Sequence, residues 1–378
     1  MRLAAKWVLP MVGAPIENGV VEIIGNTITA VGRCCGAVDL NLGDVVLLPG
    51  LINAHCHFDY TRFVDRVPYR GSFTEWIRDI VALKAQTTPS EFSDGIQAGI
   101  KLALQTGTTT VVNVESYPEL ITEIPPTPLR VIWCPELIDL HHIIRKLPLV
   151  GAGLSPHAPY TASGALYRQC AQTGRLITTH VAESIEEDEM FRQGRGALYD
   201  ACRSLGRPMA DCGHRGPVEL LSSYGVLGNN CLAVHANCLS DTDVQLLAVT
   251  GTSVVHCPNT HRFFRRATPP LEKLLQAGVN VCLGTDSLAS NRSLNLFLEM
   301  RELARVFPQL LPAQILALAT THAARALRLS DRFGLISVGA TADLIAVPGC
   351  GHADPYAAVV FAEKQVTFML IDGKVVFR

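Results

Sequence analysis

The 378-residue chain carries a formal net charge of -2, and 48% of its residues are hydrophobic while only 17% are charged. Disordered chains combine few apolar residues with many like charges, so this composition argues against disorder. The near-neutral charge also argues against a nucleic-acid partner, because neutralising phosphates requires a basic surface.

Targeting segments are not evident in the sequence. No uninterrupted apolar run reaches the roughly 18–20 residues that span a bilayer. The chain start carries Lys6 inside a short apolar segment and Pro10 soon after, without the apolar core of a signal peptide. The 12 cysteines form no CxxC pair and read as buried, reduced thiols. We therefore expect a soluble, cytoplasmic protein with no membrane partner.

Residues 1–47 and 48–336 show different patterns. The first segment predicts short β-strands at 5–10, 19–25 and 27–32, between Gly and Asn turns. The second alternates apolar strands with helices. Its predicted strands are residues 45–55, 108–116, 129–138, 149–158, 176–184, 231–238, 252–259 and 279–287.

Two of the intervening helices carry clear end signals. Residues 90–107 show apolar residues at helical spacing, with Ser90 as the expected N-cap, and residues 240–251 begin at Ser240 and stop at Gly251. Near-continuous apolar strands that alternate with helices indicate a parallel sheet buried on both faces. Eight such units predict an α/β fold with a (β/α)8 TIM barrel over residues 48–336. A doubly wound sheet is the alternative, but no GxGxxG follows a strand.

The last segment, residues 337–378, predicts β-structure again. Apolar runs cover residues 341–347 and 358–371, and Asp372-Gly373 between two such runs is a strong hairpin signal. We therefore expect residues 1–47 and 337–378 to pair into one small β-sandwich domain.

Polar residues follow the predicted barrel strands at their carboxyl ends, where barrel enzymes carry their chemistry. They include His55, His57, His157, His180, Glu183, His235, His256 and Asp286. His55 and His57 lie two apart on a strand and so point to one face. With a histidine from strand five and an aspartate from strand eight they form a nitrogen and oxygen donor set that suits zinc and tolerates iron. Each histidine taken alone is better explained as a buried core residue. Polar residues at the ends of at least five strands cannot be explained in that way.

Six motifs resemble the amidohydrolase superfamily, in its branch of triazine hydrolases and nucleobase or nucleoside deaminases. In chain order they are LLPGLINAHCHFD, GLSPHAPYT, THVAES, AVHANCL, VVHCPN and GTDSLASN. They span residues 47–291, and the terminal β segments match the small sandwich domain of that family.

The resemblance implies a role for each matching residue. Four residues are expected to bind one divalent metal ion, zinc or alternatively iron: His55, His57, His180 and Asp286. Glu183 is expected to shuttle protons, and His235 and Asp286 to orient the attacking water and accept its proton. Glu183 has a simpler alternative as a surface carboxylate ahead of the acidic run 186–189. Binuclear relatives carry a carboxylated lysine at a strand end, which this chain lacks, so we expect a single ion.

Two segments bear on the substrate. Residues 71–84 resemble the helix that closes over the ribose in adenosine-type deaminases, which implies that Glu75 accepts hydrogen bonds from ribose hydroxyls and that Trp76 packs against the pocket. An amphipathic helix with Glu75 in solvent is the alternative. His157 likewise fits a nucleoside.

Residues 257–266 read CPNTHRFFRR, where the family often has CPxSN. This departure weakens an assignment to guanine or cytosine deaminases. His261 and Arg262 belong to an arginine and aromatic set that can hold a carboxylated aromatic group, and the loop resembles that of aminodeoxyfutalosine deaminases. A solvated basic loop is the alternative.

The favoured prediction is a metal-dependent deaminase of an adenosine derivative, with 6-amino-6-deoxyfutalosine of menaquinone biosynthesis as one candidate. The alternatives are deamination of methylthioadenosine or S-adenosylhomocysteine, chlorohydrolysis or deamination of another N-heterocycle, and a metal-free scaffold. Arg130 or Arg145 can reach the substrate from nearby loops. The sequence leaves open whether the chain forms a homodimer. The sequence assigns no role to His141, His142, His256 or His322.

Overall fold

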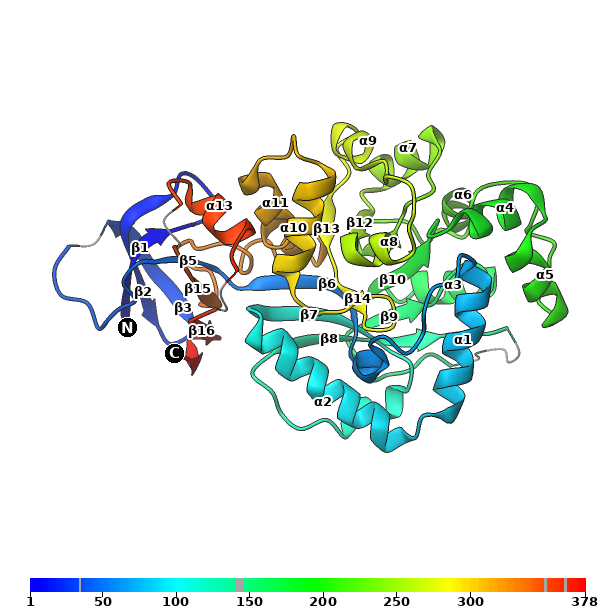
Figure 1. Cartoon of the computed structure of the whole chain (residues 1–378), viewed down its shortest axis with the longest axis horizontal. Coiled ribbons are helices and arrows are strands. Elements are labelled where there is room, and N and C mark those ends of the chain that lie inside the picture. The colour runs from blue at the N-terminus through cyan, green and yellow to red at the C-terminus, as the bar shows by residue number, and fades with distance from the viewer. Residues whose placement is uncertain (34, 141–143, 145, 350–351, 364–365) are drawn as a thin grey trace.

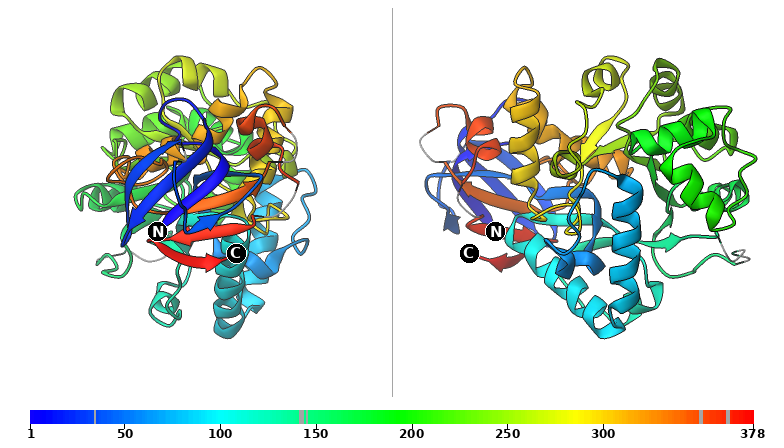
Figure 2. Two further views of the ribbon diagram at one scale, coloured as in Figure 1. Left: turned by 90° about the vertical axis from the view of Figure 1, so that its left-hand side faces the viewer. Right: turned by 45° about the vertical axis from the view of Figure 1, so that its right-hand side comes forward.

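The computed structural model describes residues 1–33, 35–140, 144, 146–349, 352–363 and 366–378. Figure 1 shows two parts along the long axis: a β-sheet built from both chain ends, and a larger body of strands surrounded by helices. The two termini lie close together on the smaller part (Figure 2). Among the described residues, no helix is both long and apolar enough to cross a bilayer.

The larger part is built on a parallel sheet. Its strands are β6 (Leu51–His57), β7 (Thr108–Glu115), β8 (Arg130–Leu137), β9 (Gly153–Pro156), β10 (Leu176–Val181), β11 (Cys231–His235), β12 (Ser253–His256), β13 (Val281–Leu283) and β14 (Asp286–Ser287). They follow the chain order from β6 to β13. β13 pairs with β12, while β14 pairs with β6 through Asp286 opposite Cys56, so residues 281–287 close the sheet. This confirms the predicted (β/α)8 barrel, with β13 and β14 as two halves of the eighth strand.

Helices surround the barrel and connect its strands (Figures 1 and 2). The helices before β10 are η1 (Phe58–Phe63), α1 (Phe73–Gln86), α2 (Pro89–Gln105), η2 (Pro118–Thr122) and α3 (Gly164–Ala171). Those after it are α4 (Ile185–Gln193), α5 (Ala197–Ser204), α6 (Pro217–Ser223), α7 (Asp241–Thr250), α8 (Pro258–Phe263), α9 (Leu271–Gln276), α10 (Leu296–Val306), α11 (Pro312–Leu318) and α12 (Thr321–Ala326). Ser240 caps α7 and Gly251 ends it, as predicted. The predicted N-cap of α2 is wrong: Thr88 caps it through a reciprocal bond with Glu91, one residue before Pro89.

The chain ends form one eight-stranded sheet. Its strands are β1 (Arg2–Val8), β2 (Ile16–Ile24), β3 (Thr27–Arg33), β4 (Leu40–Asn41), β5 (Val45–Pro49), β15 (Leu344–Pro348), β16 (Phe368–Ile371) and β17 (Lys374–Phe377). The strand order is β17-β16-β15-β5-β1-β2-β3, with β4 beside β1. β5 therefore joins the terminal sheet and runs two residues past the expected boundary at 47. Asp372 and Gly373 both have positive φ, 50° and 73°, as the predicted tight hairpin requires.

The predicted strand over residues 358–371 is wrong in its first part. Residues 355–360 form a helix, α13 (Pro355–Val360), and only Phe368–Ile371 form a strand. Asp354 caps this helix by accepting from the backbone N–H of Tyr356, and Pro355 begins it. The capping signal therefore outweighs the β-branched run that follows.

The ten described cysteines are all free, and eight of them are buried. Cys34 and Cys350 lie outside the described residues. Cys56, between two site histidines, packs in an apolar cluster with Phe58 and Ile96. It faces away from the barrel interior, because strand side chains alternate.

We expect Gly99→Val to destabilise the fold by about 1–3 kcal/mol through overpacking. A Cβ at Gly99 would lie 2.5 Å from Phe58 Cδ1 and 2.7 Å from Thr61 Oγ1, so α2 rests directly on η1, the turn after β6. Denaturant unfolding measures the loss. The matched control is Gln97→Val, at an exposed position of the same helix. Equal losses in the two variants would contradict this close packing.

Candidate metal centre

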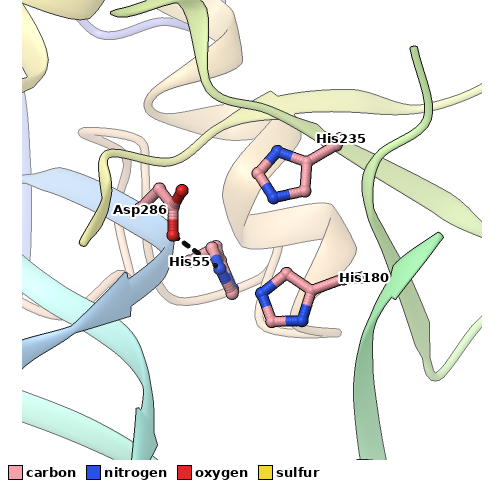
Figure 3. Close-up of side chains that lie close together, drawn as sticks. All are labelled: His55, His180, His235 and Asp286. Carbon is pink, nitrogen blue, oxygen red and sulfur yellow. Dashed lines mark ion pairs between the residues drawn. The ribbon is translucent and has the colours of Figure 1, made fainter. Parts of the chain in front are cut away.

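Four buried side chains meet at the carboxyl ends of the barrel strands. They are His55 from β6, His180 from β10, His235 from β11 and Asp286 from β14. Figure 3 shows their imidazole nitrogens and carboxylate oxygens turned toward a common centre. The potential ligand atoms all lie within 4.8 Å of one another, which is close enough for one metal ion to contact them together.

His57 lies beside this group. Its Nε2 is 3.2 Å from His55 Nε2 and 3.6 Å from Asp286 Oδ1. The two histidines of β6 therefore point to the same inward face, as their spacing predicts. The four-residue group contains His235 where the sequence analysis expects His57, so five side chains surround the centre.

The protonation of these side chains fits a bound cation. His180 Nδ1 donates to the carbonyl oxygen of His157 at 2.9 Å, which leaves the Nε2 lone pair free for a metal. Burial lowers the pKa of His57, His180 and His235, so these rings are neutral. Burial opposes the charge of Asp286, but the hydrogen bond from His55 and the nearby imidazoles hold its pKa well below the usual value. Neutral imidazoles with one carboxylate are the donor set of a zinc-type site.

The backbone is strained where it presents these residues. His235 and Asp286 have φ angles of 73° and 58°, in the left-handed region that non-glycine residues rarely adopt. Ala236 beside His235 has φ of 47°, and its N–H donates to Val181 O at 3.1 Å. Ser290 Oγ donates to Asp286 Oδ2 at 2.8 Å. Such strain concentrates at functional sites, because the surrounding structure must hold it in place.

A cavity of about 140 Å³ lies over the centre, and Glu183 lines it. Glu183 Oε2 is 3.8 Å from His235 Nε2, and Oε1 accepts from Arg266 Nη2 at 2.9 Å. Burial raises the pKa of Glu183 to about 7, against the opposing effect of Arg266. Glu183 is thus a buried group of the cavity, not a surface carboxylate ahead of α4.

Helix α1 covers the cavity. Phe73, Trp76, Ile80 and Lys84 line it from this helix. The helix is fixed at its N-terminus, where the Glu186 carboxylate accepts from the backbone N–H groups of Phe73 (2.7 Å) and Thr74 (2.9 Å). At about 140 Å³ the cavity is smaller than the roughly 300–1,000 Å³ of pockets for drug-sized ligands.

The structure separates the residues predicted to bind substrate. Trp76 and His157 line the cavity over the centre. Glu75 is exposed and does not line this cavity. His261 and Arg262 line a different cavity, where Arg262 Nη1 lies 3.3 Å from Glu302 Oε2.

The remaining candidates have structural partners or are not described. Arg130 pairs with Asp343, between the barrel and the terminal sheet. His322 Nδ1 donates to the carbonyl oxygen of Val281 at 3.1 Å. Arg145, His141 and His142 lie outside the described residues.

Two further residues, Lys84 and Glu136, line the cavity although the sequence patterns did not point to them. Lys84 Nζ lies 3.6 Å from Glu136 Oε2 and 5.1 Å from the centre of the Tyr60 ring. Burial opposes the charge of Glu136, but Lys84 and the nearby imidazoles lower its pKa to about 2. The sequence does indicate the position of Lys84. It follows Trp76, Ile77 and Ile80 at helical spacing, so it lies on the apolar face of α1.

Comparisons with known proteins agree with this geometry. The amidohydrolase family matches residues 46–376. The 5-methylthioadenosine/S-adenosylhomocysteine deaminase of Syntrophobacter fumaroxidans is 32% identical over 376 aligned residues, which cover 89% of this chain and 81% of that protein. The protein of the same name from Thermococcus sibiricus is 30% identical and covers 96% of this chain and 88% of its own length.

Two solved structures share the fold. An adenosine deaminase from Xanthomonas campestris with bound zinc matches at 25% identity with a TM-score of 0.84, over 100% of this chain and 92% of that one. The Helicobacter pylori aminofutalosine deaminase in complex with methylthio-coformycin matches at 21% identity with a TM-score of 0.88, over 100% of both chains. The second likeness is evidence of the fold alone.

We expect Zn²⁺ to raise the melting temperature of metal-free protein, because a ligand that binds only the folded state stabilises it, by about 2.7 kcal/mol at 100 times its Kd. Asp286→Asn should lose most of this gain, because it removes the only carboxylate of the group. The matched control is His214→Ala, which removes an exposed histidine elsewhere. A scanning calorimeter measures the shifts. An equal zinc effect in wild type and Asp286→Asn would rule out this centre.

Proposed function

The chain belongs to the amidohydrolase family, and from this premise we propose that it is a metal-dependent hydrolase that deaminates an adenosine derivative and releases ammonia. The observation that carries the proposal is the buried metal-binding group with Glu183 at its edge. Support comes from the two relatives of 30–32% identity, both named as deaminases of adenosine derivatives.

We assign the ligands of a single ion as predicted from the sequence: His55, His57, His180 and Asp286. Zinc is the first candidate and iron the second. An ion held by these residues acts as a Lewis acid and lowers the pKa of water. His235 is left to orient the attacking water, since its neutral ring faces both the centre and Glu183.

Glu183 is assigned the proton transfers. Water adds to the ring carbon that bears the amino group, the carbon–nitrogen bond breaks, and ammonia leaves. Glu183 gives a proton to the adjacent ring nitrogen, while Asp286 takes one proton from the water and passes it to the departing amino group. As the carbonyl forms, the hydroxyl proton returns to Glu183, which restores both carboxyl groups. A buried carboxyl whose pKa is near neutrality suits both giving and accepting protons.

The cavity wall supports a nucleoside substrate. Trp76 offers an apolar face, and His157 offers a ring nitrogen to the purine. Lys84 and Glu136 place a donor and an acceptor in the same wall, which suits ribose hydroxyls. We propose that this pair takes the part expected of Glu75.

Two kinds of substrate fit within this class. The relatives favour methylthioadenosine or S-adenosylhomocysteine. The arginine and aromatic residues of the 257–266 loop favour an adenosine with a carboxylated tail, such as 6-amino-6-deoxyfutalosine. The cytoplasmic location and the homodimer stay predictions.

We expect ammonia release from adenosine derivatives and none from guanine or a triazine. Glu183→Gln should lower kcat about 10²–10⁴-fold, the usual contribution of a general acid–base group, with the metal content unchanged. Glu119→Gln, at an exposed position, is the matched control. A coupled ammonia assay and metal analysis measure both. Turnover of guanine or a triazine alone would overturn the substrate class, and retained turnover in Glu183→Gln would remove Glu183 from the mechanism.

Lys84→Met should raise KM for the nucleoside roughly tenfold, the effect of losing one hydrogen bond from a charged donor to a neutral hydroxyl. Glu75→Gln on the same helix should leave KM unchanged, because its carboxylate is exposed. Steady-state kinetics with one adenosine derivative measures both. The opposite result, a raised KM in Glu75→Gln alone, would restore the original prediction for Glu75.

A further inference from the structure

A second cavity, of about 450 Å³, shares no lining residue with the cavity over the metal centre. It lies between the segment after β12 and helix α10. Four arginines line it, Arg262, Arg265, Arg266 and Arg305, together with one carboxylate, Glu302. Positive charge is therefore in excess on its walls.

The single carboxylate is already engaged. Glu302 accepts from Arg305 Nη2 at 2.6 Å and from Arg305 Nε at 2.9 Å, and Arg262 Nη1 lies 3.3 Å away. The side chain of Arg265 forms no hydrogen bond or ion pair with any described residue. Arg266 pairs with Glu183, which belongs to the other cavity. Two of the four guanidinium groups thus lack a carboxylate within this cavity.

One buried donor in the same walls lacks a partner, and a histidine beside it makes no hydrogen bond. Arg266 is 10% exposed, and its buried Nε has no hydrogen-bond partner. His256 is 5% exposed, and within the described part of the chain its ring nitrogens have no hydrogen-bond partner. Burial lowers the pKa of His256 to about 3, so the ring is neutral and keeps one N–H donor. The unsatisfied buried Nε of Arg266 is costly, which indicates that a ligand completes this site.

Arg266 is held where it can serve both cavities. Its guanidinium carbon lies 5.0 Å from the centre of the Phe73 ring and 4.6 Å from that of Phe264. Nη2 donates to Glu183 Oε1 at 2.9 Å, while Nε stays free. A guanidinium has five donors in a rigid fork, so one group can bind two anions at once.

We propose that this cavity binds an oxyanion, a carboxylate or phosphate group, through Arg265, Arg266 and His256. The bound anion shares Arg266 with Glu183. Arginine forks match the oxygens of both anion types, and charge-assisted bonds to them are strong. Only the link to catalysis rests on the proposed function, because binding itself needs no turnover.

Binding is tested on the metal-loaded protein by calorimetry, with inorganic phosphate and benzoate as separate probes. At least one probe should bind at one site per chain, and Arg265→Gln should weaken it roughly tenfold, the effect of losing one charge-assisted hydrogen bond. The matched control is Arg203→Gln, which removes an exposed arginine that pairs with Asp200. No binding of either probe, or equal weakening in both variants, would overturn the proposal, even if the enzyme is active.

Kinetics then separates the two sources of the anion. If the carboxylate belongs to the substrate, Arg265→Gln raises KM for an adenosine with a carboxylated tail and leaves KM for methylthioadenosine unchanged. If free phosphate is the ligand, phosphate changes kcat of wild type at saturating substrate, and Arg265→Gln weakens that response. Either pattern supports the site. Binding without any effect on kcat or KM would overturn the shared role of Arg266.

Discussion

The pairing of β14 with β6 is the contact on which the rest of the site depends. Asp286 lies opposite Cys56, and Thr285 N donates to His55 O at 3.1 Å. These bonds join the last barrel strand to the first, across more than two hundred residues of chain. Because all strands are parallel, closure brings their carboxyl ends into one ring, and His55 and Asp286 become neighbours. An open sheet of the same strands would hold these two residues at opposite edges.

Closure of the barrel also determines the electrostatic environment of the metal-binding group. The ring concentrates imidazoles around one carboxylate at a buried site, where an isolated charge is expensive. Glu136 keeps its charge through Lys84, and Glu183 is held by Arg266. The Lys84–Glu136 pair thus lies in the wall of the cavity, whereas Arg266 reaches Glu183 from the neighbouring cavity. Each of the two carboxylates in the wall is therefore held by its own cation.

The strand pattern and the barrel were predictable from the sequence. The start of α13 and the rotation of α1 against the barrel were not. Strand alternation placed His55 and His57 on one face, and eight apolar strands between helices predicted the barrel. Residues 358–360 were predicted as a strand because β-branched residues favour strands, whereas Asp354 and Pro355 start a helix there. The family resemblance of residues 71–84 points to Glu75 as the ribose contact, whereas Lys84 is the residue that lines the cavity. The rotation of α1 about its axis decides which of them faces the cavity, and that rotation depends on contacts with distant segments such as Glu186.

The acidic run after β10 looks like a solvated helix start, yet each carboxylate in its first part has a specific partner. Glu186 holds the N-terminus of α1, and Glu187 accepts from the backbone N–H of Glu183 at 2.7 Å. Phe73, bound by Glu186, also stacks on Arg266, which binds Glu183. These contacts connect the N-terminus of α1 to the carboxylate of Glu183. Any movement of α1 therefore strains the same contacts that orient the Glu183 carboxylate.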